Sequence, residues 1–226
     1  MGAGKMNLEK KIPVLLCKFE KKNPAIYSSH LAVMRAFHMA IRRAGLSIAY
    51  STGFNPHPRL FMSQPMPVGQ ESECEYFAAE SVETPTTFIK KINPVLQEGI
   101  KILKCVRASK NPNFVVNCFA SRYEIVLGEK VKLPDFAEIL KADSYQISFK
   151  HKGENITKDV RSMIFDMKQE DNVCEFTLSS SSHSLRPDRL INHLLKLINA
   201  ENICYSVTKK EVFDKSFTSF DKLFFA

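Results

Sequence analysis

The chain has 226 residues, of which 44% are hydrophobic and 25% are charged, as in an ordinary globular protein of one large or two small domains. No apolar run approaches the roughly 20 residues of a transmembrane helix, and the N-terminus lacks a secretory signal pattern, so we expect a cytoplasmic protein with no membrane partner. The formal net charge of +8 favours an anionic partner, nucleic acid first.

The six cysteines are scattered and form no CxxC pair, and each lies in an apolar, strand-like context. This pattern is typical of free thiols in a core. No two histidines have the close spacing of a metal site, and no P-loop or GxGxxG motif is present. We therefore predict no cofactor and no metal ion, with a site built from His30 and His57 brought together in space as the open alternative.

The first half of the chain predicts the order β-α-β-β-α-β. The expected elements are strands at 11–20, 47–51, 73–80 and 100–107 and helices at 29–44 and 86–96. Ser28 or Ser29 can cap the first helix, Gly45 can end it, and Pro85 precedes the second helix. This order is that of a ferredoxin-like unit.

Residues 110–117 read as a linker, after which the pattern recurs. Strands are expected at 121–127, 145–149, 173–179 and 203–212 and helices at 134–142 and 187–198, while a polar insertion at 151–159 and the segment 160–167 stay unassigned. Cys74 and Cys174 fall in matching strands of the two halves. We therefore predict an α+β protein of two tandem ferredoxin-like units with antiparallel sheets. The first unit spans 1–110, and the second spans 111–226 with a Phe-rich tail that packs back on the body or binds a partner.

The segment 29–69 carries a distinctive motif. It reads SHL, then RAF and AIRRAGLSIAYSTGFNPHPRLFMSQPMPVG, with Ser72 shortly after. This string resembles the signature of the radical-SAM-linked family of uncharacterised bacterial proteins, and the segments LRP at 185–187 and 209–213 resemble its second half more loosely. Ala32 and Met66 depart from the family pattern, which has Asp and Leu there, so no carboxylate adjoins His30.

The resemblance implies a radical SAM protein, encoded nearby or fused, as a partner. It also implies a context of RNA or a ribosome-related factor, without an established activity. The chain has no CxxxCxxC cluster to bind an iron–sulfur centre of its own.

Candidate binding residues concentrate on the first helix and the loop after it. They are Ser29, His30, Arg35, Arg42, Arg43, Asn55, His57 and Arg59. A phosphate at the helix start could be met by Ser29, His30 and an arginine, because free amides and the helix dipole favour an anion there. His30 could equally be a capping or half-buried residue, or a general acid–base group. We expect these side chains to form one preorganised basic cleft.

The loop GFNPHP holds the expected structural residues Gly53, Phe54, Pro56 and Pro58, and Gly69 lies further along the chain. Two prolines flank His57 and restrict its backbone, which suits either rigid presentation of His57 or a tight loop with Phe54 plugged into the core. Gly53 and Gly69 are expected to adopt conformations that other residues resist.

Three functions remain open at this point. The first is a non-catalytic accessory module that binds RNA, with catalytic residues absent. The second is a metal-independent RNA endonuclease resembling CRISPR RNA-processing enzymes, with His30 or His57 as the acid–base group. The third is an adaptor that docks a radical SAM enzyme through the proline loop or the tail. Aromatic residues of the strands could also bind RNA on a sheet face, but their alternation fits a core role better.

Overall fold

The computed structural model describes residues 12–64, 66–151, 153–181 and 183–226. The first half forms β1 (Val14–Lys21), α1 (His30–Arg43), β2 (Leu60–Met62), β3 (Glu71–Glu80), α2 (Pro85–Ile92) and β4 (Ile100–Ala108). The second half forms α3 (Phe114–Asn117), β5 (Ala120–Leu127), α4 (Phe136–Lys141), β6 (Gln146–His151), β7 (Glu154–Asp159), β8 (Ile164–Glu170), β9 (Val173–Ser179), α5 (Pro187–Leu197), β10 (Tyr205–Phe213) and α6 (Phe220–Phe224).

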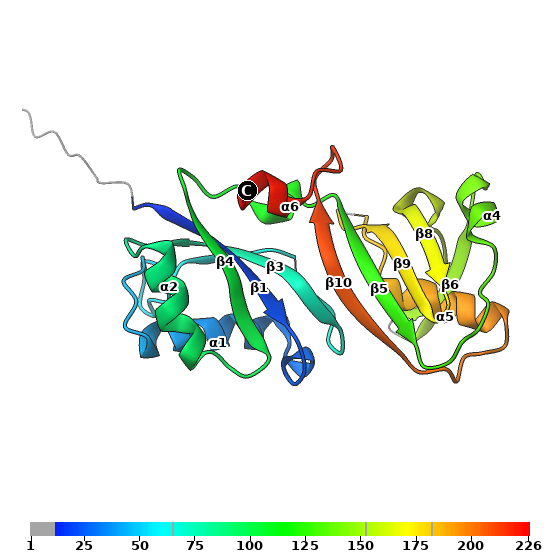
Figure 1. Cartoon of the computed structure of the whole chain (residues 1–226), viewed down its shortest axis with the longest axis horizontal. Helices are drawn as coiled ribbons and strands as arrows, with labels where there is room; N and C mark the ends of the chain where they lie inside the picture. Colours follow the sequence, from blue (N-terminus) through cyan, green and yellow to red (C-terminus); the bar gives the residue numbers. More distant parts are fainter. Residues whose placement is uncertain (1–11, 65, 152, 182) are drawn as a thin grey trace, which may run out of the picture.

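One large sheet runs through the whole molecule in the order β4-β1-β3-β10-β5-β9-β8, and β2 adds to β3 (Figure 1). All pairings in it are antiparallel except that of β10 with β3, which is parallel. The strands β6 and β7 form a separate hairpin. The protein is thus a mixed α+β fold built on a large, mostly antiparallel sheet.

The outer edge of β3 serves two partners. Its start pairs with β10 over only two residues, Glu71 with Thr208 and Ser72 with Lys209. Its later part pairs with β2 at Phe77, Ala78 and Ala79. Between these two pairings, no described strand pairs with this edge of β3, and the two halves of the sheet meet there.

The helices α1 and α2 cover one face of the first half. Ser29 caps α1 by accepting a hydrogen bond from the Ala32 amide, at 3.2 Å, as the sequence predicts. The buried face of α1 presents Phe37 to the rings of Phe19 and Phe77, each with its centroid 4.9 Å away. This aromatic cluster fixes the helix on the sheet.

The C-terminal tail covers the other face of the first half. Phe220 and Phe225 are buried there with Phe114 of α3 and Tyr76 of β3. The tail therefore packs back on the body, and the predicted linker 110–117 contains a short helix that joins the same core. In Figure 1, α6 lies on the opposite side of the sheet from α1 and α2.

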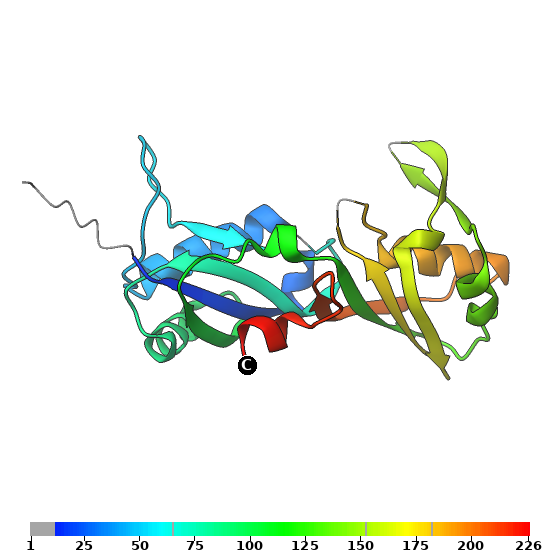
Figure 2. The same cartoon turned by 90° about the horizontal axis from the view of Figure 1, so that it is seen from above.

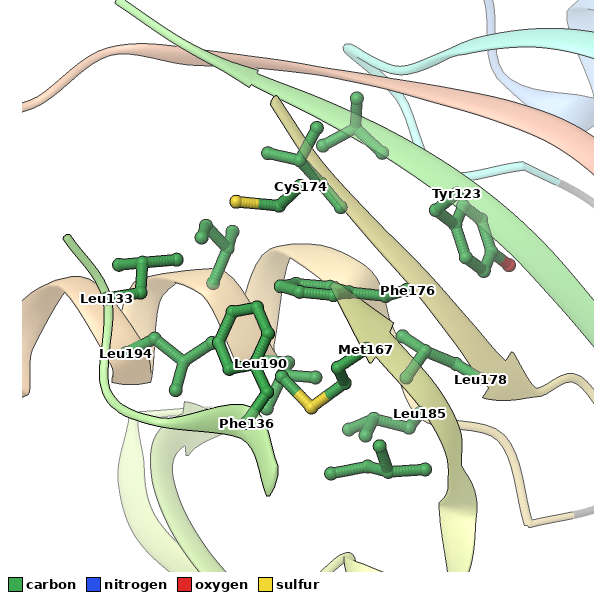
Figure 3. Close-up of a cluster of buried hydrophobic side chains, with 14 of the residues drawn as sticks. Tyr123, Leu133, Phe136, Met167, Cys174, Phe176, Leu178, Leu185, Leu190 and Leu194 are labelled. Atoms are coloured by element: carbon green, nitrogen blue, oxygen red, sulfur yellow. The ribbon is translucent and has the colours of Figure 1, made fainter. Parts of the chain in front are cut away.

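The second half has its own core beneath α5. Phe136, Met167, Phe176 and Leu190 interdigitate there with further aliphatic side chains (Figure 3). The other face of these strands carries ion pairs, such as that between Lys168 and Glu175, so it stays polar.

Several expected elements differ from the structure. The segment 47–51 forms only isolated bridges, Ile48 with Ser81 and Tyr50 with Pro58, because its neighbours diverge into a loop rather than a ladder. The second helix ends at Ile92 and continues as a short 3-10 turn, since Pro94 has no amide to donate. The insertion at 151–159 contains β7, which pairs with β6, the strand predicted at 145–149, and the unassigned segment 160–167 contains a 3-10 turn and the start of β8.

The predicted strand at 11–20 is β1, which begins at Val14; residue 11 lies outside the described residues. In the described part of the chain, no helix combines the length and apolar character needed to cross a membrane.

Candidate functional site

The outer face of α1 is basic and exposed. Arg35, Arg42 and Arg43 all lie on it, with the apolar side chains of Leu31 and Met39 exposed between them. The spacing explains this arrangement, because residues three and four apart on a helix lie on one face. The inner face, with Val33, Phe37, Ala40 and Ile41, is buried as described above.

These three arginines are not neutralised by the protein. Within the described residues, the arginines that form ion pairs are Arg59, Arg122 and Arg186, and none of the outer-face arginines is among them. Arg42 donates to the backbone oxygen of Pro56 at 3.4 Å, and Arg43 donates to that of Met39 at 3.5 Å. Neither contact cancels the positive charge.

The loop between α1 and β2 stands away from the body (Figure 2). Its base is closed by a hydrogen bond from the Ser51 amide to the His57 oxygen, 2.9 Å, and by one from Arg59 to Ala49, 2.8 Å. Gly53 has a φ of 123°, which only glycine adopts without strain. Phe54 has 106% relative exposure. Phe54 is therefore not a plug for the core: the expectation was wrong, since Pro58 is the buried residue of this loop.

His57 is held rigidly at the side of this loop. Its Nδ1 lies 3.0 Å from the Ser51 hydroxyl and 3.3 Å from the Asn55 oxygen. Its ring lies 5.6 Å from that of His38, centroid to centroid. Burial lowers the pKa of His38, and the neighbouring charges of His57 and Arg42 lower it further.

The predicted binding residues do not form one cleft. His57 lies beside His38 and Arg42, near the end of α1, whereas Ser29 and His30 lie at its start. A rise of 1.5 Å per residue separates the backbone of His30 from that of Arg42 by about 18 Å. Arg59 differs from the other predicted arginines because it pairs with Glu80 at 2.9 Å and lies over the ring of Phe61.

His30 instead lines a small cavity of about 20 Å³ with Lys21, Ser28, Ser63 and Glu75. A larger cavity of about 430 Å³ lies next to it at the junction of the two halves and shares Ser63 and Met66 with it. Serine hydroxyls, Tyr76, Tyr123, Arg186 and Lys209 line the larger cavity.

Charged groups are buried between these cavities. Lys21 is 3% exposed, Glu75 is 5% and Lys209 is 6%. Burial alone would lower the pKa of Lys209, but its Nζ lies 2.5 Å from Glu75 Oε1, and this pairing outweighs burial and raises the pKa. Burial is the largest cause that lowers the pKa of Lys21, against the opposing field of Glu75.

Sequence reasoning missed this central group. Lys21 and Lys209 lie in strands of opposite halves, so no local spacing connects them. The available signal was the serine run 179–182 with Ser184, which ends three residues before Pro187 at the start of α5, because clustered hydroxyls before a helix offer many hydrogen-bond donors.

The remaining predicted residues have structural roles. Gly69 has a φ of 85°, as expected of its turn, and its amide donates to the Ile26 oxygen. Most strand aromatics are buried, Phe19, Tyr76, Phe77, Tyr123 and Phe176 among them, which fits a core role. Across the described ranges, no group of three or more His, Cys, Asp or Glu residues is placed to bind a metal ion.

Comparisons with known proteins give a family and a distant structural similarity. A family model described as "Uncharacterized protein conserved in bacteria (DUF2344)" matches residues 15–187. Among curated proteins, no sequence matches this chain. A chain of the crystal structure of a Cbf5-Nop10-Gar1 complex is similar with a TM-score of 0.43 and 10% identity, over 89% of this chain and 49% of that chain. The protein thus spans about half the length of that chain, and the similarity is too remote to carry an argument.

Proposed function

The chain belongs to this family of uncharacterized bacterial proteins, and we propose that it is a non-catalytic module that binds single-stranded RNA through the outer face of α1 and the loop 50–58. The observation that carries the proposal is the row of Arg35, Arg42 and Arg43, exposed and without carboxylate partners. Uncompensated arginines on one face attract phosphates and release the counterions of the nucleic acid.

Exposed aromatic side chains before α1 and in the loop after it favour an unpaired strand. Phe54 projects at the loop, and Tyr27 and Tyr50 are exposed at the two ends of the α1 region. Bases of a single strand stack on such rings, whereas in a duplex they are already stacked. Asn55 and His57 add hydrogen-bonding groups held by the closed base of the loop.

The proposal also includes two expectations from the sequence, the tandem ferredoxin-like units and the radical SAM partner. The strand order β4-β1-β3-β2 of the first half is matched by β10-β5-β9-β8 in the second, which supports two tandem ferredoxin-like units with β6–β7 as an insertion. The motif resemblance at 29–69 supports a radical SAM protein as the partner. A tail-mediated adaptor is disfavoured by the burial of Phe220 and Phe225.

The test is binding of a single-stranded RNA oligonucleotide over a range of salt concentrations. Replacing Arg35, Arg42 and Arg43 with Ala removes three phosphate contacts, so the slope of log K against log salt should fall by about 2, at roughly 0.7 per contact. Phe54→Ala should cost about 1–3 kcal/mol of affinity at any salt concentration, from one lost stacking platform.

The matched control replaces three exposed lysines, Lys110, Lys196 and Lys215, with Ala. These lysines belong to no ion pair among the described residues, and their replacement changes the net charge by the same amount as the arginine variant. An unchanged affinity and slope in the arginine variant, or an equal loss in the control, would refute the proposed surface. If the native protein cleaved the RNA in EDTA and His57→Ala abolished this cleavage, the protein would be a nuclease and the proposal of a non-catalytic binding module would be refuted.

A further inference from the structure

We infer that the junction of the two halves is a binding site for a phosphorylated small molecule of up to mononucleotide size, with Lys21 receiving its phosphate. The site consists of the 430 Å³ cavity and the small cavity beside it. It is separate from the outer face of α1, and the inference does not rest on RNA binding.

The charge balance of the interior points to an anion. Lys21, Lys209 and Glu75 are all more than nine-tenths buried, and two ammonium groups against one carboxylate leave one positive charge. Glu75 pairs with Lys209. No described residue forms an ion pair with Lys21 or accepts a hydrogen bond from its ammonium group. Burying a charge without a partner costs free energy, so an anionic ligand would supply the negative charge that the described residues do not place on Lys21.

Two adjoining cavities lie at this junction, and Lys21 lines the smaller one. Lys21 lines the small cavity, whose 20 Å³ is room for about one oxygen-sized group. Ser63 and Met66 line both cavities, so the two cavities adjoin at these side chains, and a ligand in the large one lies next to the small cavity that Lys21 lines. His30, the first residue of α1, lies on the small cavity, where the positive end of the helix dipole also favours negative charge.

The lining of the large cavity suits a phosphate ester rather than a bare ion. Hydroxyl groups that can donate to phosphate oxygens come from Ser63, Ser121 and Ser184. One of Ser179 and Ser181 can add a further donor, because their hydroxyls share one hydrogen bond, while Ser180 donates to Ser121. Leu185, Val212 and Phe220 provide an apolar wall for an organic group. A volume of 430 Å³ lies within the range of about 300–1,000 Å³ typical of ligand pockets.

Calorimetry with the whole chain tests the inference, with inorganic phosphate and AMP as probes and adenosine as the uncharged comparison. AMP should bind more tightly than phosphate, and adenosine should bind at least about tenfold more weakly than AMP, because it lacks the group that pairs with Lys21. Lys21→Met should weaken AMP binding at least about tenfold while leaving the unligated protein no less stable.

Controls distinguish this site from the surface proposed for RNA. Lys110→Met, at an exposed position, and the triple arginine variant should bind AMP as the native chain does. Should Lys21→Met not fold, His30→Leu at the half-exposed helix start provides the second variant, with a several-fold loss expected. The inference is overturned if neither probe binds at millimolar concentration, or if the folded Lys21 or His30 variant binds AMP unchanged.

Discussion

His38 lies half-buried on α1 beside His57 and Arg42. Burial, the charge of His57 and the charge of Arg42 lower its pKa in that order, against a hydrogen bond with the backbone of Pro58. The loop 50–58 thus packs its one rigid histidine against a histidine that resists protonation.

We predict that protonation of His38 destabilises the folded state. As pH falls below about 6.5, the unfolded chain takes up a proton at His38 before the folded chain does, so stability is lost down through the lower, folded pKa. The free energy of unfolding in urea should be smaller at pH 5 than at pH 7, and His38→Gln should reduce that difference. The lowered pKa of His193 acts in the same direction and leaves a residual slope. An NMR titration in which His38 has a pKa at or above 6.5 would contradict this prediction.

At the scale of elements, α1 is defined by local residues at its two ends and by a buried face that packs on the sheet. Ser29 caps its start, Gly45 follows its end with a φ of 60°, and Phe37 anchors its middle in the aromatic cluster. The same helix presents its arginines outward and His30 to the central cavity. Its stability therefore bears on both proposed sites.

We predict that Ser29→Ala destabilises the protein by about 1 kcal/mol, because the Ala32 amide loses its only described acceptor. Ser29→Asp should retain most of the stability, since a carboxylate also caps and favours the helix dipole. Ser109→Ala, at an exposed position directly after β4, is the matched control and should stay within about 0.5 kcal/mol of the native protein. Equal unfolding free energies for Ser29→Ala and Ser109→Ala would contradict the role of the cap.

At the scale of the whole molecule, the two halves of the sheet are joined by a short strand pairing, by polar contacts and by the buried cluster under the tail. β10 and β3 pair over two residues, Lys209 forms the ion pair with Glu75, and Gln70 donates to Asp188 of α5 at 3.2 Å. The tail adds contacts from the other face, where Lys18 and Lys104 pair with Asp221. Because two ammonium groups are buried at this junction, we expect its stability to depend on the carboxylate of Glu75.

We predict that Glu75→Gln lowers the free energy of unfolding by about 3–5 kcal/mol, because it leaves two buried ammonium groups without a carboxylate. Combining it with Lys21→Met should restore part of that loss, since one of the two charges is gone. Urea unfolding of both variants and of Lys21→Met alone forms the double-mutant cycle. Additive effects would show that Lys21 and Glu75 do not interact.

Local patterns in the sequence were enough for most of the elements. The Ser29 cap, the Pro85 start of α2, the glycine conformations at Gly53 and Gly69, and the recurrence of strands and helices all depend on residues close in the chain. The predicted binding residues on the outside of α1 followed from the same periodicity, because a face repeats every three or four residues.

Only the tertiary structure decided how those elements share edges and interiors. β3 divides its edge between β2 and β10, Phe54 points into solvent, and Lys21 is buried beside Glu75 with Lys209 from the other half. Each of these depends on contacts between residues far apart in sequence, whose burial no local pattern records. The sequence by itself therefore determined the elements and the basic helix face, while packing between the halves created the central cavity.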